Sequence, residues 1–220
     1  MSNLLFDAIK TQSKITNRVL VGFSSGKDSI VTMDLCFKFF DEVVPYFMYI
    51  VPGLEFQEQT LRKYEKHYNT KIIRIPHFDV SGFMKYGAFR PPDENSQIIE
   101  INDVYEYLRQ QTGAYWIAAG ERISDSIVRR AMIKASGSIN KKTGRFYPIA
   151  HWTKSDVMAY IRKERLYLPK DSRGLGFSFK SLAGEELAWV KETYPEDYKK
   201  IIQMYPFAEA AVKRLEYYGE

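Results

Sequence analysis

Residues 24–29, Ser-Ser-Gly-Lys-Asp-Ser, constrain the fold of this chain more than any other segment. An apolar run at 18–23 precedes them and a second at 30–36 follows, a pattern that predicts a buried strand, a turn of small residues and a helix. The first backbone N–H groups of a helix have no partner inside it, and the helix dipole places positive charge at the same end. The turn is therefore a candidate phosphate-binding loop.

This loop departs from the Walker A pattern, in which four residues separate a glycine from Gly-Lys and a Ser or Thr follows the Lys. Here Gly22 stands one residue too close to Gly26, and Asp28 follows Lys27. An acidic side chain at this place repels a phosphate unless it caps the helix or meets a cation. Asp28 is therefore a candidate ligand for Mg²⁺.

Strand and helix patterns alternate through the first two thirds of the chain. Short apolar runs predict strands at 18–23, 44–51, 71–75 and 115–119. Helical patterns cover 27–40, 55–67, 101–112, 124–135 and 153–165. The alternation predicts an α/β fold with a doubly wound, mainly parallel sheet. Ligands of such sheets bind beyond the carboxyl ends of the strands, so we expect residues 24–29, 52–55 and 120–122 to meet at one crevice.

The remaining segments have weaker patterns. Residues 78–95 read as a loop with one helical turn, and the basic, glycine-containing segment 136–145 as a mobile loop or a hairpin tip. Residues 171–179 form a glycine-rich connection, and the Tyr-rich segment 184–220 predicts two or three small helices. We therefore divide the chain into a nucleotide-binding α/β domain at 1–170 and a helical C-terminal extension at 171–220.

Composition narrows the class of protein. No apolar stretch is long enough to cross a membrane, and residues 1–14 lack the apolar core of a signal peptide. The single cysteine, Cys36, can neither form an internal disulfide nor alone hold a zinc or an iron–sulfur cluster. We therefore expect a cytoplasmic protein. The net charge of +5 suits a nucleotide or nucleic-acid partner, and an ordinary solvated surface equally well.

Two acidic residues begin the helix after the second strand. Gly53 forms part of the preceding turn, and Glu55 and Glu58 lie in the first turn of the helix. The helix dipole by itself explains carboxylates at these positions. In the functional interpretation they face a nucleotide or help to place Mg²⁺.

Arginines follow the fourth strand. Gly120 would let the backbone approach a ligand closely, and Arg122 would point from the strand end into the crevice. One of Arg129 and Arg130 would join it, because planar guanidinium groups bind phosphate or sulfate through two parallel donors. A solvated basic helix face is the alternative explanation for this pair.

Taken together, these segments resemble the PP-loop ATP pyrophosphatase superfamily and, within it, the phosphoadenylyl-sulfate (PAPS) reductase branch. Residues 24–29 are similar to its Ser-Gly-Gly-x-Asp-Ser loop, with Ser25 at the first glycine position. Residues 53–60, Gly120-x-Arg122 and the segment from Pro148 onwards match the branch in the same order. The resemblance implies a five-stranded sheet of the adenine nucleotide alpha hydrolase type, cleavage of ATP between the α and β phosphates, and ATP with Mg²⁺ as cofactors.

The resemblance also implies roles for individual residues. The expected catalytic residues are Lys27, Asp28 and Arg122. The expected Mg²⁺ ligands are Asp28 and Glu55. The expected nucleotide-binding residues are Ser24, Ser25, Gly26, Lys27, Asp28, Ser29, Gly53, Glu55, Gly120, Arg129 and Arg130. His151 is the one histidine that we expect near the crevice, with a structural role more than a catalytic one.

The branch's reductases attack with a cysteine on a C-terminal tail, a residue that this sequence does not contain. We therefore expect adenylation, in which an acceptor oxygen attacks the α-phosphate of ATP and pyrophosphate leaves, with a sulfur or nitrogen donor supplied by a partner protein. Two alternatives stay open. One is a reductase that binds an adenine sulfonucleotide and borrows a thiol. The other is a non-catalytic nucleotide- and nucleic-acid-binding subunit, suggested by the basic segments 141–145 and 162–165. The Tyr-rich helices could bury a homodimer interface or pack within one chain.

Overall fold

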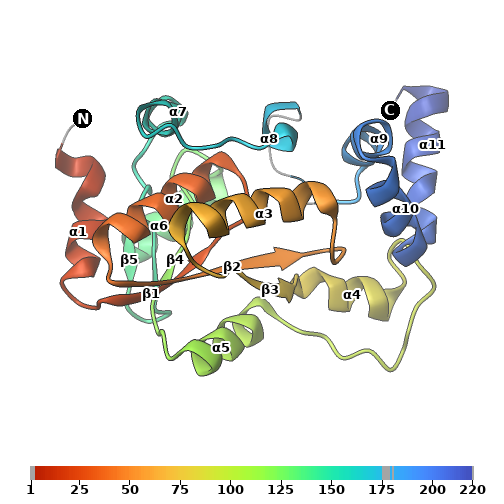
Figure 1. Ribbon diagram of the computed structural model, residues 1–220. Helices are drawn as coiled ribbons and strands as arrows, with labels where there is room; N and C mark the ends of the chain where they lie inside the picture. The colour runs from red at the N-terminus through yellow and green to blue at the C-terminus, as the bar shows by residue number, and fades with distance from the viewer. Residues whose placement is uncertain (1–2, 175–178, 180, 220) are drawn as a thin grey trace.

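The computed structural model describes residues 3–174, 179 and 181–219, which form a sheet with helices on both faces (Figure 1). The described strands are β1 (Arg18–Gly22), β2 (Glu42–Tyr49), β3 (Ile73–Pro76), β4 (Ile117–Ala118), β5 (Ile139–Asn140) and β6 (Arg145–Phe146). They form one sheet in the order β3-β2-β1-β4-β6-β5. All adjacent pairs are parallel except β5 and β6. The predicted α/β fold with a mainly parallel sheet is thus confirmed, and the segment 136–145 contributes a hairpin whose antiparallel strand β5 extends the predicted sheet.

The strand order reverses next to β1. The chain moves outward from β1 to β2 and β3, and then returns to place β4 on the other side of β1. Such a reversal leaves a crevice beyond the carboxyl ends of the two central strands. The loop at 24–29 leaves β1 at this point, and Gly120 follows β4.

Helices cover both faces because successive residues of β1 point to opposite sides of the sheet. The described helices are α1 (Asp7–Ser13), α2 (Lys27–Phe39), α3 (Glu55–Tyr68), α4 (Phe78–Tyr86), α5 (Ile101–Thr112), α6 (Ile127–Ser136), α7 (Lys154–Lys163), α8 (Lys170–Gly174), α9 (Gly184–Thr193), α10 (Pro195–Met204) and α11 (Glu209–Tyr218), with short 3-10 turns at Asn3–Phe6 and Pro206–Ala208. Val19 and Val21 pack into the core formed with α2, α3 and α7, whereas Leu20 packs on α5 (Figure 1). No helix in the described ranges has both the length and the apolar character that a membrane span requires.

Two helices were not expected at their observed length. Helix α4 fills nine residues of a segment that predicts only one turn, because Gly82 in its interior weakens the helical pattern. His77 caps its start by accepting a hydrogen bond from the Asp79 N–H, and Gly87 ends it in the left-handed conformation. Helix α1 follows the 3-10 turn Asn3–Phe6, which is held by the indole N–H of Trp152 that donates to the Leu5 carbonyl at 2.6 Å.

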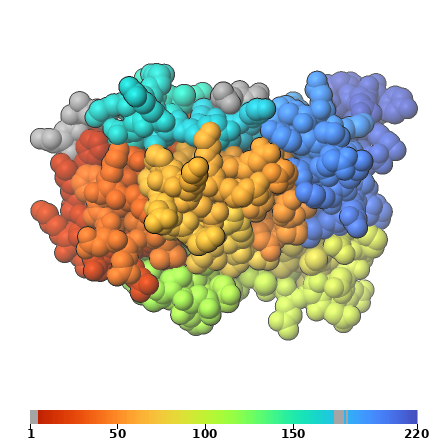
Figure 2. Space-filling view, viewed as in Figure 1, coloured from red at the N-terminus to blue at the C-terminus, as the bar shows by residue number. Residues whose placement is uncertain are grey.

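The C-terminal helices α9 to α11 confirm the prediction of two or three small helices. They share a core with the connection before α3 and with the first turn of α3, where Leu54 and Phe56 belong to the same apolar cluster as Leu187, Val190 and their neighbours. In the space-filling view these helices lie directly against the segment that contains α3 (Figure 2). Trp189, Tyr194, Tyr198 and Tyr205 therefore pack within the chain, whereas Phe207, Tyr217 and Tyr218 are exposed. The division at residue 170 and the homodimer stay predictions.

Candidate active site

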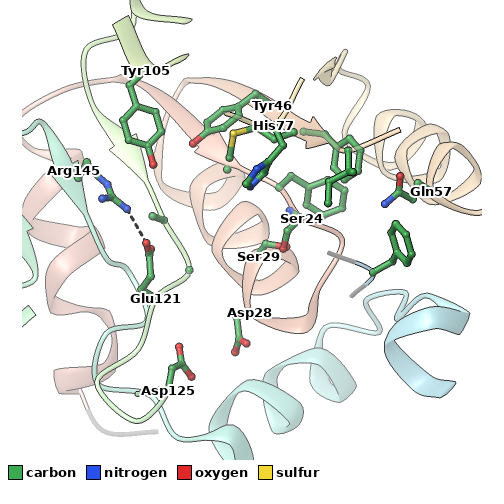
Figure 3. Close-up of a pocket in the computed structure, with 18 of the residues that line it drawn as sticks. Ser24, Asp28, Ser29, Tyr46, Gln57, His77, Tyr105, Glu121, Asp125 and Arg145 are labelled. Atoms are coloured by element: carbon green, nitrogen blue, oxygen red, sulfur yellow. Dashed lines mark hydrogen bonds and ion pairs between the residues drawn. The ribbon is translucent and has the colours of Figure 1, made fainter. Parts of the chain in front are cut away.

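A cavity of about 430 Å³ occupies the predicted crevice (Figure 3). Its volume is in the range of pockets that hold a small ligand or cofactor. Segments far apart in the sequence line it, and they contribute Gly22, Phe23, Ser24, Asp28, Ser29, Tyr46, Phe47, Met48, Ile50, Gln57, His77, Tyr105, Ala119, Gly120, Glu121, Asp125, Arg129, Arg145 and Phe179. The phosphate loop and the segment after β4 thus meet as the sequence predicts.

Hydroxyl groups tie the two ends of the loop together. Ser29 Oγ donates to the Gly26 carbonyl at 2.9 Å and accepts from the Ser24 N–H at 3.1 Å. Ser25 between them is buried and has a φ of 59°, the left-handed conformation that glycine adopts most easily. This explains physically why a loop of this shape accepts glycine at that position.

The start of α2 presents free donors. Gly26 precedes the helix without a side-chain cap, and the first backbone bond runs from the Ile30 N–H to the Gly26 carbonyl. The N–H groups of Lys27, Asp28 and Ser29 therefore have no acceptor inside the helix. Ser24, Asp28 and Ser29 line the cavity, so this helix start can receive an anion bound there.

Charges of alternating sign connect the loop with the segment after β4. Asp28 forms ion pairs with Lys27 at 2.9 Å and with Arg122 at 3.0 Å. Asp125 pairs with Arg122 at 2.7 Å and with Arg129 at 3.4 Å. Lys27 and Arg122, two of the three expected catalytic side chains, therefore both contact the third, Asp28.

Arg122 does not point into the crevice, although its place after the fourth strand predicts that it would. Its side chain is only 7% exposed and lies outside the cavity lining, held between Asp28 and Asp125. Arg129 lines the cavity and is half exposed, whereas Arg130 lines a separate hollow. Arg129 is thus the arginine of this pair that can reach a bound ligand.

The expectation that Glu55 and Gly53 belong to the site is not met by the geometry. The half-exposed Glu55 pairs with Arg62, and the carbonyl of Gly53 accepts a hydrogen bond from Lys200 at 2.8 Å. Neither residue lines the cavity, because α3 turns Phe56 and Gln57 inward and Glu55 toward solvent. From this segment Ile50 and Gln57 line the cavity instead.

Gly120 lets the backbone after β4 lie close to other protein atoms, in addition to any ligand. A Cβ atom at this position would lie 3.1 Å from the carbonyl carbon of Asp28 and 3.2 Å from Thr32 Oγ1. The glycine therefore lets the segment after β4 pack against the first turn of α2. Any side chain here would push the phosphate loop away from the central strands.

A polar cluster that the sequence did not reveal lies at the other side of the cavity. Glu121 accepts a hydrogen bond from Arg145 at 2.7 Å (Figure 3). The Arg145 guanidinium packs over the rings of Tyr105 and Tyr147. Burial raises the pKa of the Tyr46 and Tyr105 hydroxyls, so both stay protonated at neutral pH. Tyr46, Tyr105 and Arg145 belong to β2, α5 and β6, and Glu121 and Tyr147 follow β4 and β6, so only the tertiary fold brings them together. No local sequence signal marks them.

The histidine near the cavity is also different from the expected one. His77 lines the cavity, and burial lowers its pKa below the usual 6.5 although Asp79 opposes the shift. His151 lies elsewhere, with its Nε2 atom 3.1 Å from Ser138 Oγ. The expectation that placed His151 at the crevice is therefore corrected.

Comparisons with known proteins agree with this geometry. Residues 18–170 match the family model described as "Phosphoadenosine phosphosulfate reductase domain". Two uncharacterized proteins of Methanocaldococcus jannaschii are each 25% identical to the chain, over 212 residues (86% of this chain and 42% of the relative) and over 193 residues (83% and 46%). The chain thus spans less than half the length of these curated relatives.

One solved structure shows the same fold, and a second was also found by the comparison. An NH3-dependent NAD synthetase from Campylobacter jejuni superposes with a TM-score of 0.51 at 17% identity, covering 99% of this chain and 94% of that chain. A U34-tRNA thiolase from Methanococcus maripaludis, at 14% identity, has a TM-score of 0.48 over 97% of this chain and 79% of its own. The family match covers more than half of the chain, and the loop, the crevice and the strand order agree with it. The chain belongs to the phosphoadenosine phosphosulfate reductase domain family.

Proposed function

We propose that this chain is an ATP pyrophosphatase that adenylates an acceptor. The observation that carries the proposal is the uncapped start of α2, which opens into the cavity beside paired charges from the segment after β4. In the reaction an acceptor oxygen attacks the α-phosphorus of ATP, the bond between the α-phosphorus and the bridging oxygen breaks, and pyrophosphate leaves with the electron pair. Pyrophosphate is highly charged, so the main task of the protein is to stabilise the negative charge on this leaving group.

The loop supplies the contacts for that leaving group. The free N–H groups of Lys27, Asp28 and Ser29 and the hydroxyl of Ser24 hold the pyrophosphate oxygens. Lys27 neutralises their charge by exchanging its contact with Asp28 for one with a phosphate. Arg129, which follows β4, binds the acceptor or the α-phosphate. Arg122 positions the carboxylates of Asp28 and Asp125 through its ion pairs with them.

The carboxylates fit a single Mg²⁺ ion. Within the described ranges no group of three or more His, Cys, Asp or Glu side chains is arranged to hold a metal. Mg²⁺ bound with a nucleotide commonly uses only one or two carboxylates, with phosphates and water completing its shell. Asp28 and Asp125 both line the cavity, and the buried Asp28 Oδ1 lies 3.0 Å from Arg122 Nε, a contact that it would exchange for the ion. These two would hold the ion, which neutralises phosphate charge when bound. Glu55 does not fit this role.

Turnover of ATP by the purified chain with Mg²⁺ and candidate acceptors tests the proposal. We expect AMP and pyrophosphate as products, and we expect Lys27→Ala and Asp28→Ala to abolish their release while the protein stays folded. Lys66→Ala, which removes an exposed lysine of α3, is the matched control and should leave turnover unchanged. Release of ADP and phosphate, or unchanged turnover by Lys27→Ala, would refute the mechanism.

Family membership keeps a sulfonucleotide reductase as a second candidate. Cys36 cannot supply its thiolate, because the side chain is fully buried in α2 and burial raises its pKa far above the usual range. Such an activity needs a thiol from a partner protein. Calorimetric titration with adenosine 3′,5′-bisphosphate and with ATP separates the two functions, since a reductase should bind the bisphosphate more tightly.

A further inference from the structure

Residues 126–155 form a segment with no acidic residue. It contains seven lysines and arginines, Arg129, Arg130, Lys134, Lys141, Lys142, Arg145 and Lys154. The whole chain has 32 basic and 27 acidic residues, so the rest of it keeps 25 basic residues against 27 acidic ones and is net negative. The positive charge of this protein is therefore a property of one segment.

Part of this segment forms a groove next to the active-site cavity. Arg130 and Lys134 of α6 line a hollow of about 350 Å³ together with Ser124, His151 and Thr153. Arg129, the residue before Arg130, lines the cavity itself. The start of α6 thus presents one cation to the cavity and the next one to the groove.

The cations of the groove are available to a ligand. In the described part of the chain neither Arg130 nor Lys134 forms an ion pair, although Arg130 Nε donates a hydrogen bond to the Ile123 carbonyl at 3.4 Å. The neighbouring carboxylates are already engaged, since Asp125 pairs with Arg122 and Arg129, and Asp156 accepts from the Thr153 N–H and hydroxyl at the start of α7. The same start of α7 adds the positive end of a ten-residue helix to the groove.

The helix that carries Arg130 and Lys134 also exposes two large apolar side chains. Ile127 and Val128, in the first turn of α6, are 82% and 77% exposed. Helix α6 buries only Ile133 among the residues from Ile127 to Ser136. Large apolar side chains beside free cations suit a ligand that carries both an anionic backbone and flat apolar groups.

We infer that the groove binds the phosphodiester backbone of a single-stranded nucleic acid, and that this strand delivers the acceptor group to the cavity. The inference rests on the proposed function for the second of these steps. Phosphates pair with Arg130 and Lys134, and unstacked bases contact Ile127 and Val128. A strand is required because the cavity of about 430 Å³ admits a nucleotide but not a duplex.

Fluorescence anisotropy of a labelled 20-nucleotide RNA, measured without ATP between 0.05 and 0.3 M salt, tests the groove directly. The variant is Arg130→Ala/Lys134→Ala, and the control Lys66→Ala/Lys71→Ala removes the same charge from exposed positions near β3. The loss of two phosphate contacts should reduce the salt slope by about 1.4 and weaken binding about 25-fold at 0.1 M salt. The control should bind like the wild type, and thermal melting should show both variants folded.

Equal affinity and salt slope for the two double variants would overturn the inference. Competition by polyglutamate at the same charge concentration as RNA would also overturn it, in favour of an acidic protein partner. A DNA strand of the same sequence tells which nucleic acid is preferred, and tighter binding of either supports the inference. Lys27→Ala separates this inference from the proposed function, because it should lose ATP turnover and keep wild-type RNA affinity.

Discussion

Substitution of Gly120 by alanine probes the contact on which the phosphate loop depends. The added Cβ would stand 3.1 Å from the Asp28 carbonyl carbon and 3.2 Å from both the Asp28 oxygen and Thr32 Oγ1. Two of these three neighbours are backbone atoms in the first turn of α2, which cannot rotate away as a flexible side chain can. Overpacking of this kind costs about 1–3 kcal/mol. We therefore expect Gly120→Ala to lower the free energy of unfolding by that amount.

The same clash should weaken ligand binding, because relief requires the start of α2 to move away from β4. Urea unfolding measures stability, and calorimetry with ATP and Mg²⁺ measures binding. The matched control is Gly82→Ala in α4, where an added Cβ meets no atom within 4 Å. Alanine is the better helix former, so the control should gain about 0.5–1 kcal/mol and bind ATP normally. A Gly120→Ala protein as stable as the wild type, with unchanged ATP affinity, would refute the packing argument.

Two further predictions concern single residues of the cavity region. Ser25 has a φ of 59°, so Ser25→Gly should fold and turn over ATP at least as well as the wild type. The β-branched Ser25→Val should lose about 1–2 kcal/mol of unfolding free energy, measured in urea. Equal stability of the two variants would contradict this. Burial lowers the pKa of His77 in the folded protein below the 6.5 of the unfolded chain. The unfolded chain therefore binds more protons near that pH, and the free energy of unfolding should rise as the pH increases from 5 to 7. His77→Gln should flatten that part of the pH profile, and an unchanged slope would show that another group causes it.

Local patterns predicted the elements that carry strong local signals. Helix α5 has the predicted bounds, and α2 and α3 begin at their predicted residues, because each combines an apolar stripe with a turn before it. The phosphate loop could also be predicted from the sequence, because its chemistry depends on neighbouring residues in one turn. Thr153 and Asp156 show that a local signal can hold even when one residue of the pattern differs. Asp replaces the usual Glu or Gln of a capping box, and both reciprocal hydrogen bonds nevertheless form.

The parts that escaped prediction depend on contacts between distant segments. Arg145 reads as a loop residue in the sequence, but β6 places it beside β4, where it reaches Glu121. Tyr46 enters the cavity because it stands opposite Gly22 in the parallel register of β1 and β2. Glu55 was assigned to the site from its place at a helix start, which fixes its distance along the chain but not the direction in which it points.

Arg122 and Arg129 show why that direction matters, and substitution can separate their roles. Arg122 is 7% exposed and contacts two carboxylates that are 23% and 12% exposed, so Arg122→Ala leaves both without their buried cation and should cost about 3–5 kcal/mol of stability. The half-exposed Arg129 contacts Asp125 at 3.4 Å, so Arg129→Ala should change stability by less than about 1 kcal/mol. Because Arg129 lines the cavity, its loss should instead raise the KM for ATP or the acceptor. Urea unfolding and steady-state kinetics measure both effects. If Arg122→Ala were as stable as Arg129→Ala, the ion pairs with Asp28 and Asp125 would not hold the first turn of α2 against the segment after β4, and the loop would owe its shape to its own hydrogen bonds.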